Sequence, residues 1–231
     1  MKTVTLPPHI NLTAQKSSLN KYFFACGILS SILYIVMNIW AAMRYEGYDS
    51  ISQTVSELSA IGAPTRSLWV PLGFIYTLLI IAFGWGIWRT STGNRPLRNT
   101  GMMLFIYGMA GLFWPLAPMH QREVLAAGGG TFSDTMHIVF SMITVPLMML
   151  AIGFSAVAFG RRFRVYAILT LGMLVVFGIL TGIDGPKIAD NLPTPFIGIW
   201  ERILIGVFLA WAVVLGIKLL RDQTYLKRLN A

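Results

Sequence analysis

Six stretches of roughly twenty mostly apolar residues constrain the fold of this chain more than any other feature. They occupy residues 22–43, 68–88, 99–117, 136–160, 165–183 and 197–220 of the 231. A helix needs about 20 apolar residues to cross the hydrocarbon core of a bilayer, where backbone groups must hydrogen bond to one another. The sequence therefore predicts an all-α, polytopic transmembrane bundle of six helices over residues 22–220.

Composition agrees with a membrane protein and narrows the functional classes. Apolar residue types make up 55% of the chain and charged types 12%, which is about half the charged share of a typical soluble domain. These values exclude disorder, a coiled coil and a nucleic-acid-binding module, and they disfavour a water-soluble enzyme. The single cysteine, Cys26, cannot form an internal disulfide or a cysteine-based zinc cluster.

The distribution of charge predicts the orientation in the membrane. Cytoplasmic loops and tails carry an excess of Lys and Arg. We therefore expect both the N-terminal tail, 1–21, and the basic tail, 221–231, in the cytoplasm, and the chain in the cell membrane. Asp222 is then the only acid inside. The net charge of +9 reflects this sidedness and contact with anionic lipid, not nucleic acid. The basic residues placed inside are Lys2, Lys16, Lys21, Arg89, Arg95, Arg98, Arg161, Arg162, Arg164, Lys218, Arg221, Lys227 and Arg228.

The first outer connection, 44–67, has the spacing of a short amphipathic helix. Ile51, Val55 and Leu58 recur at intervals of four and three, which leaves Gln53 and Glu57 on the polar side. Such a helix either lies on the outer leaflet or folds back between the spans as a lid. The sequence leaves both arrangements open.

The second outer connection contains a candidate pair of histidines. Two prolines, at 115 and 118, are expected to break the third span before His120 and Arg122. His137 lies one turn inside the fourth span, with Ser141 one turn further on the same face. Because the third histidine, His9, is in the N-terminal tail, only His120 and His137 can meet.

Two acids mark the third outer connection. Asp184 is expected at the end of the fifth helix, which Gly185 and Pro186 terminate. Glu201 falls nearly two turns inside the sixth span, where an ionised side chain costs about 2.5–3.5 kcal/mol unless it faces the bundle interior or pairs. We expect Glu201 to turn inward and its neighbour Arg202 to extend to the outer interface. With Glu57 and the two histidines, these acids form one polar layer near the outer surface.

Four short motifs resemble a known family as an ordered set. They are the segment 52–60 (SQTVSELSA), the segment 119–122 (MHQR), His137 early in the fourth span, and the segment 198–202 (GIWER). Together they resemble a prokaryotic integral membrane family catalogued as domain of unknown function 998. The resemblance extends from the first span to the last. It implies a multi-span helical bundle and carries no established activity.

One functional hypothesis is a membrane-embedded enzyme that modifies a lipid, with Glu201, His137 and Asp184 as catalytic groups. A buried glutamate and a histidine suit general acid–base chemistry. Alternatively, His120, His137 and Asp184 hold a zinc ion with a position left for water. A Ser–His–Asp arrangement of Ser141, His137 and Asp184 is a further possibility, although no nucleophile-elbow motif is present.

A second hypothesis, which the sequence favours, is binding or transport of a lipid or small amphiphile in an outward-facing pocket. Intramembrane acids and broken helices suit this role equally well. The expected ligand-binding residues are Glu57, Gln53, His120, Arg122 and Glu201.

A third hypothesis is a structural or accessory subunit. Gly178 and Gly182 on the fifth span form a GxxxG pair that permits close contact within the chain or between copies in a homo-oligomer.

Overall fold

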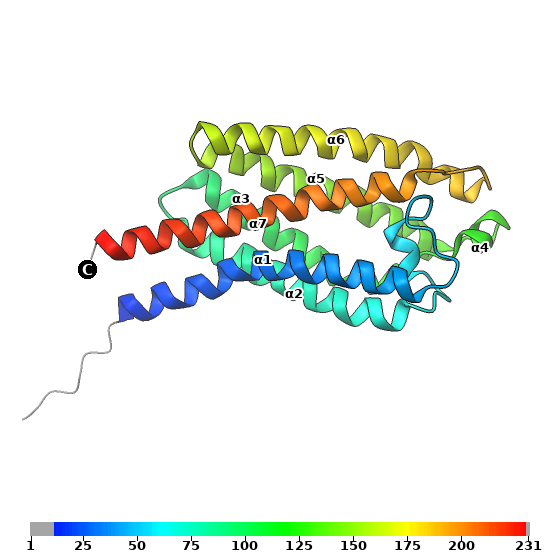
Figure 1. The fold of residues 1–231 in the computed structure, drawn as a ribbon, viewed down its shortest axis with the longest axis horizontal. Coiled ribbons are helices and arrows are strands. Elements are labelled where there is room, and N and C mark those ends of the chain that lie inside the picture. The colour runs from blue at the N-terminus through cyan, green and yellow to red at the C-terminus, as the bar shows by residue number, and fades with distance from the viewer. Residues whose placement is uncertain (1–11, 230–231) are drawn as a thin grey trace, which may run out of the picture.

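The computed structural model describes residues 12–229, and the side chains of 19–222. Within these residues the chain forms seven α-helices and two short 3-10 helices (Figure 1). The all-α prediction is confirmed for this part of the chain, where the only β-type pairing is an isolated bridge between Ile61 and His120. The elements are α1 (Leu12–Arg44), η1 (Val55–Ser59), α2 (Arg66–Thr90), α3 (Arg95–Gly111), η2 (Trp114–Leu116), α4 (Arg122–Ala126), α5 (Phe132–Ala158), α6 (Arg161–Ala189) and α7 (Ile197–Leu229).

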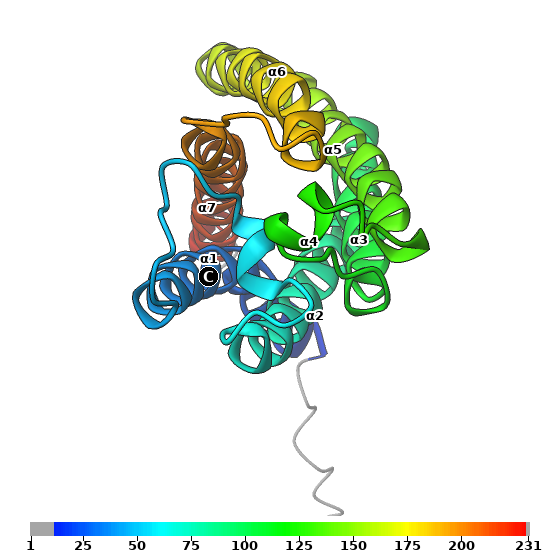
Figure 2. The same ribbon diagram turned by 90° about the vertical axis from the view of Figure 1, so that its right-hand side faces the viewer.

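Six long helices form a closed ring. Each packs against the next in the order α1, α2, α3, α5, α6 and α7, and α7 returns to α1. Figure 2, which looks along the ring axis, shows the short elements η1 and α4 over one end of it. Long-range contacts between the first and last helices therefore close the bundle around its interior.

Five of the ring helices, α1, α2, α5, α6 and α7, are long and apolar enough to cross a membrane, so this is a multi-pass membrane protein. The predicted third span, 99–117, is not among them. Its helix, α3, begins at Arg95 with polar residues and ends at Gly111, because the prolines that follow favour the 3-10 turn of η2. The prediction of six spans is therefore confirmed only for five.

Other helix boundaries also differ from the predicted ones. α1 begins at Leu12, well inside the predicted polar tail, and α7 continues to Leu229. Pro186 does not end its helix, because α6 runs on to Ala189. A proline removes only one backbone hydrogen-bond donor, and the helix continues past it. The chain turns at Asn191, whose φ of 56° lies in the left-handed region. The predicted placement of His9 and of the first and last few basic residues lies outside the residues whose side chains are described.

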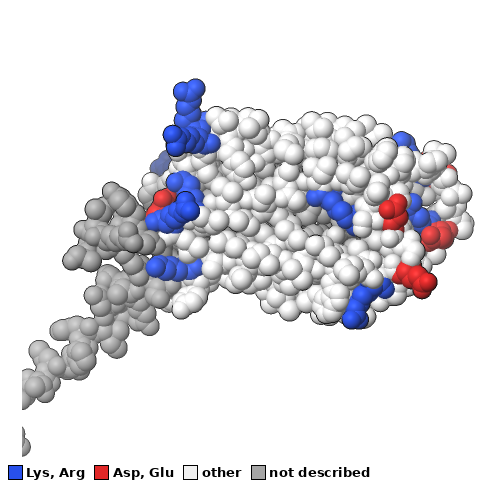
Figure 3. All heavy atoms as spheres, in the orientation of Figure 1, with Lys and Arg blue, Asp and Glu red and all other residues white. Residues whose placement is uncertain are grey.

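Charge divides the bundle into two ends. Figure 3 shows a concentration of Lys and Arg at the end where α1 begins and α7 ends, which we call the basic end, whereas at the opposite end Lys and Arg are mixed with Asp and Glu. Among the described residues, every Asp and Glu except Asp222 lies at the opposite, acidic end, together with η1, η2 and α4. The charge asymmetry expected from the sequence is thus present in the fold.

Helices α2 and α3 approach backbone to backbone at two glycines. A Cβ atom at Gly84 would collide with the backbone of Leu104 and Phe105, and one at Gly101 with the backbone of Trp88. Any larger residue at these positions would force the helices apart. The sequence hypothesis had placed such close contact at Gly178 and Gly182 instead.

Among the described residues, the GxxxG pair of Gly178 and Gly182 makes no close backbone contact. A Cβ at Gly178 would meet only a methyl group of Leu204, at 3.4 Å, and a Cβ at Gly182 would meet nothing within 4 Å among the described residues. The possibility that the pair joins two copies of the chain stays a prediction.

Large apolar side chains fill the bundle toward the basic end. The buried cluster includes Phe83, Leu104, Ile152, Phe208, Trp211 and Leu215. The indole N–H of Trp211 donates to Ser155 Oγ at 3.0 Å, which satisfies a polar atom that would otherwise be stranded in the core. The interior is therefore closely packed there, and the polar residues of interest all lie nearer the acidic end.

Candidate functional site

The segment between α1 and α2 folds back over the ring as a lid. It contains only the short helix η1, so the predicted amphipathic helix over 44–67 is wrong, and η1 contacts α1, α2 and α7. Asp49 accepts hydrogen bonds from Ile51 N at 3.0 Å and Ser52 Oγ at 2.6 Å, which forms a turn where a helix was expected. Of the two arrangements left open by the sequence, the lid is the one observed.

Glu57 is buried, contrary to its predicted place on a polar face, because a charged partner comes from another connection. Its side chain is only 3% exposed, and both its oxygens are bound by Arg122, at 2.6 Å from Nε and 3.0 Å from Nη2. The carboxylate also accepts from Thr54 N at 2.6 Å and from Gln53 Nε2 at 3.2 Å. The hydrogen bonds to Glu57 raise the pKa of the Arg122 guanidinium.

Arg202 holds the other side of the lid. Its Nη1 donates to the carbonyl oxygens of Ser50 at 2.9 Å, Gln53 at 3.0 Å and Gly198 at 3.0 Å. Its Nη2 donates to Tyr48 Oη at 2.6 Å. The carbonyls of the lid, at the acidic end of the bundle, therefore supply the partners of Arg202, and its extension to the outer interface stays a prediction. Gly198 lets the lid approach, since a Cβ there would collide with three of its carbonyl oxygens.

Tyr48 links this guanidinium to the lid. Its hydroxyl donates to Thr54 O at 2.6 Å and accepts from Arg202. Burial raises the pKa of Tyr48 to about 12, despite the opposing effect of Arg202. The neutral hydroxyl can therefore serve both bonds at any physiological pH.

We expect deprotonation of the Tyr48 hydroxyl to lower the free energy of unfolding at alkaline pH. Because the folded-state pKa lies above the ordinary value of 10.0, its contribution is full below pH 10 and is lost as the pH rises toward 12. Tyr48→Phe should be less stable than the wild type at pH 8, and the difference in unfolding free energy should shrink between pH 10 and 12. A difference that stays constant across that interval in detergent unfolding curves would contradict this assignment.

Glu201 turns inward, as predicted, and anchors the start of η1. Its Oε2 accepts from Val55 N at 2.5 Å and its Oε1 from Ser56 Oγ at 3.3 Å. The carboxyl group therefore takes a backbone donor that the first turn of η1 leaves free.

His137 meets the same serine from the other side. Its Nε2 lies 3.1 Å from Ser56 Oγ, and its Nδ1 lies 2.9 Å from the carbonyl oxygen of Ala117. Trp114 packs edge-on against the imidazole, with ring centroids 4.7 Å apart. Glu201, Ser56 and His137 thus form one hydrogen-bonded chain contributed by α7, η1 and α5.

His120 has a separate partner that sequence reasoning missed. Asp134 accepts from His120 N at 2.7 Å, and its other oxygen lies 2.8 Å from His120 Nδ1. The same carboxylate accepts from Thr131 N at 2.8 Å as an N-terminal cap of α5. The spacing of Thr131 and Asp134 is that of a capping box, which is the sequence signal for a structural role of Asp134 at the start of this helix.

The expected zinc ligands do not come together. Asp184 pairs with Lys187 Nζ at 2.7 Å, while His120 and His137 bind the different groups given above. Among the described residues, no three His, Cys, Asp or Glu side chains are grouped to hold a metal. The alternative triad is not assembled either, because Ser141 Oγ donates to the backbone oxygen of His137 and not to its ring.

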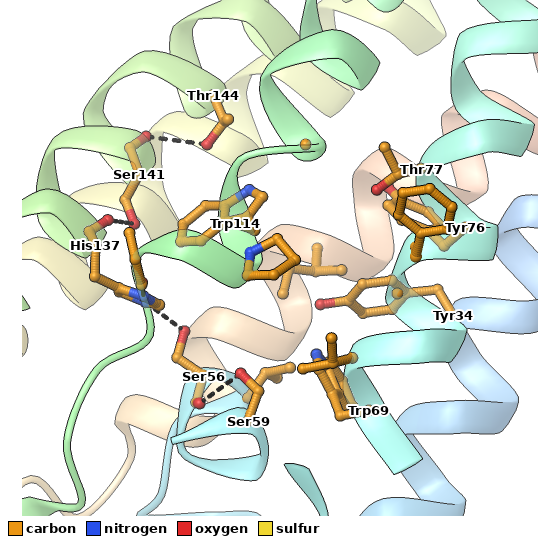
Figure 4. Close-up of a pocket in the computed structure, with 18 of the residues that line it drawn as sticks. Tyr34, Ser56, Ser59, Trp69, Tyr76, Thr77, Trp114, His137, Ser141 and Thr144 are labelled. Atoms are coloured by element: carbon orange, nitrogen blue, oxygen red, sulfur yellow. Dashed lines mark hydrogen bonds between the residues drawn. The ribbon is translucent and has the colours of Figure 1, made fainter. Parts of the chain in front are cut away.

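A cavity of about 260 Å³ lies beneath the lid. Of the predicted site residues, only His137, Ser141 and Glu201 line it. Figure 4 shows Ser56 and His137 on one side and Tyr34 on the other, with the Tyr34 hydroxyl pointing across toward them. The remaining wall is mostly apolar and aromatic, and includes Met37, Trp69, Val70, Phe74, Tyr76, Ile80, Tyr107, Trp114, Val145, Met148, Leu204 and Ile205.

Several lining residues carried no sequence signal. Tyr34 and Trp69 lie in apolar spans, where an aromatic residue facing a cavity has the same pattern as one facing lipid. Ser56 lies inside the 52–60 motif, but its hydroxyl is not among the titratable groups from which the site was predicted. Glu57 and Gln53 lie in the lid and Arg122 binds it, but neither these three nor His120 lines the cavity.

The comparisons with known proteins agree with the resemblance seen in the motifs. No curated protein and no solved structure matches the chain. The family described as "Protein of unknown function (DUF998)" matches residues 28–218, which include the lid, the cavity, the whole of α2, α3, α5 and α6, and most of α1 and α7. The chain therefore belongs to this family of unknown function.

Proposed function

We propose that the protein binds a small amphiphile or the polar end of a lipid in the cavity beneath the lid. The observation that carries this proposal is the Tyr34 hydroxyl, which points into the cavity (Figure 4) and has no hydrogen-bond partner among the described residues. The Trp69 indole N–H, on the same wall, has none there either. A buried polar group without a partner costs about 1–3 kcal/mol, so an occupant with matching polar groups stabilises this arrangement.

The distribution of polar and apolar residues in the lining favours an amphiphile over a fully polar solute. The lid side offers Ser56, His137 and Glu201, whereas the side toward the basic end offers apolar residues such as Met148 and Leu204. A volume of about 260 Å³ is at the small end for ligand pockets. It suits a headgroup and a short apolar segment, with any longer chain outside.

The proposed orientation places the cavity on the outer side of the cell membrane. We include α3 as a sixth span, since it completes the ring between α2 and α5. The basic end then faces the cytoplasm with both termini, as the excess of Lys and Arg there supports. The packed cluster around Trp211 lies between the cavity and that end. Binding from the outer leaflet therefore fits this structure better than passage through it.

Native mass spectrometry of protein purified in mild detergent tests the proposal. We expect co-purified lipid on the wild type, and binding of an added lysophospholipid that Tyr34→Phe weakens roughly three- to tenfold through loss of one hydrogen bond. Tyr166→Phe, on α6 outside the cavity, is the matched control and should bind as the wild type does. Equal binding by both variants would contradict the proposal and favour a structural role for the polar residues.

A further inference from the structure

The hydrogen-bond partners of His137 decide which ring nitrogen carries the proton. A backbone carbonyl can only accept, so Nδ1, which lies 2.9 Å from the oxygen of Ala117, must be the protonated nitrogen. In the neutral ring, Nε2 then presents a bare lone pair to Ser56 Oγ, 3.1 Å away. Ser56 Oγ carries one hydrogen and has two acceptors within reach, Nε2 and, at 3.3 Å, Glu201 Oε1. The hydroxyl rotates between them, and when it turns to the closer Nε2, Ser56 is the donor in that bond. This is the tautomer that a general base needs to take a proton from a serine.

The ring is held in this orientation from two sides. Ala117, whose carbonyl oxygen accepts from Nδ1, is 1% exposed, and Trp114 packs edge-on against the imidazole. On the other side, Glu201 fixes the first turn of η1 through Val55 N, and the pair between Glu57 and Arg122 fixes the next residue. Both partners of the Ser56–His137 bond therefore sit on anchored backbone, and Figure 4 shows their side chains pointing toward each other.

The other two serines in the cavity wall lack this environment. Ser59 Oγ donates to Ser56 O at 3.1 Å, and Ser141 Oγ donates to His137 O at 3.0 Å. A carbonyl oxygen holds a hydroxyl in place but does not take its proton. All three serines line the cavity, but Ser56 alone has a histidine nitrogen at its hydroxyl.

We propose that Ser56 is a nucleophile and His137 its general base in the hydrolysis of a carboxylic ester of an amphiphile bound in the cavity. Ser56 Oγ forms a bond to the ester carbonyl carbon while its proton passes to His137 Nε2. The bond to the alcohol then breaks, and the alcohol leaves with the proton from Nε2. Water next attacks the acyl-serine, gives a proton to Nε2, and releases the carboxylic acid as Ser56 recovers its hydrogen. The proposal rests on the proposed function, because the ester must occupy the same cavity.

An alkyl fluorophosphonate tests the dyad on the full-length protein in detergent, since an activated serine displaces fluoride and keeps the tag. Peptide mapping should place the tag on Ser56. His137→Gln should slow labelling by about a hundredfold or more, the usual contribution of a general base. Ser52→Ala, whose hydroxyl binds Asp49 on the same lid away from the cavity, should be labelled at the wild-type rate.

Three results would overturn the dyad: an unlabelled wild type, a tag on Ser59 or Ser141 in place of Ser56, or labelling that His137→Gln does not slow. Lysophospholipid binding measured on the same samples separates this proposal from the proposed function. Binding without labelling overturns the dyad alone. Labelling of Ser56 in a wild type that binds no lysophospholipid overturns the proposed ligand class and supports the dyad.

Discussion

Replacing Arg122 with methionine should lower the free energy of unfolding by about 3–5 kcal/mol, the usual cost of removing one partner from a buried ion pair. The Glu57 carboxylate is only 3% exposed, and without the guanidinium it would stay charged in a buried place or take up a proton. Its remaining donors, Thr54 N and Gln53 Nε2, are neutral and compensate only part of the charge. Unfolding in mixed detergent micelles, followed by circular dichroism, measures the loss.

A second substitution separates the charge from the packing. In the Arg122→Met background, Glu57→Gln should recover stability, because an amide keeps the shape of the side chain and leaves no buried charge. Arg98→Met, at an exposed position on α3, is the control and should change stability by less than about 0.5 kcal/mol. If Arg122→Met behaves like Arg98→Met, the ion pair does not hold the lid.

Hydropathy located the ring helices because each must be apolar over about 20 residues to cross a bilayer. The third span is not confirmed, because α3 has only 17 residues and is short by that measure. Glycine contacts with α2 hold α3 in the ring. Whether a helix belongs to the ring is decided by its neighbours, which a hydropathy profile of one segment does not contain. The outcome of the proline near 115 was predictable, since it acts on its own helix.

The lid was mispredicted for a related reason. The spacing of Ile51, Val55 and Leu58 indicated a helix, but Asp49 bonds the backbone ahead of it and turns the chain. Whether Glu57 faces water was left open by the sequence, because its partner Arg122 is 65 residues away. Pairings over such distances depend on the closed ring, so the sequence could identify the polar residues of this end and not which of them meet.

Replacing Arg202 with lysine should free the 48–53 part of the lid while the ring stays folded. The planar guanidinium reaches three carbonyl oxygens and the Tyr48 hydroxyl together, whereas a lysine ammonium at the end of a flexible chain cannot match that fork. Hydrogen bonds to a charged group are worth about 1.5–3 kcal/mol each. Loss of two of them would raise the open population of the lid by at least about a hundredfold.

Thiol labelling measures this opening and also tests the orientation. In a Cys26→Ala background, Ser50→Cys places a half-buried thiol under the Arg202 fork. An impermeant maleimide added to intact cells should label it slowly, and Arg202→Lys should speed the reaction on the order of a hundredfold. Arg44→Lys, at the same end of the bundle and stacked on Trp40, should leave the rate unchanged. Equal rates in both variants would show that the fork does not hold the lid, and labelling only after the cells are opened would place this end in the cytoplasm.

Because the lid covers the cavity, the same Arg202→Lys substitution should also speed release of a bound lysophospholipid. A change in labelling without a change in release would mean that the ligand leaves by another path.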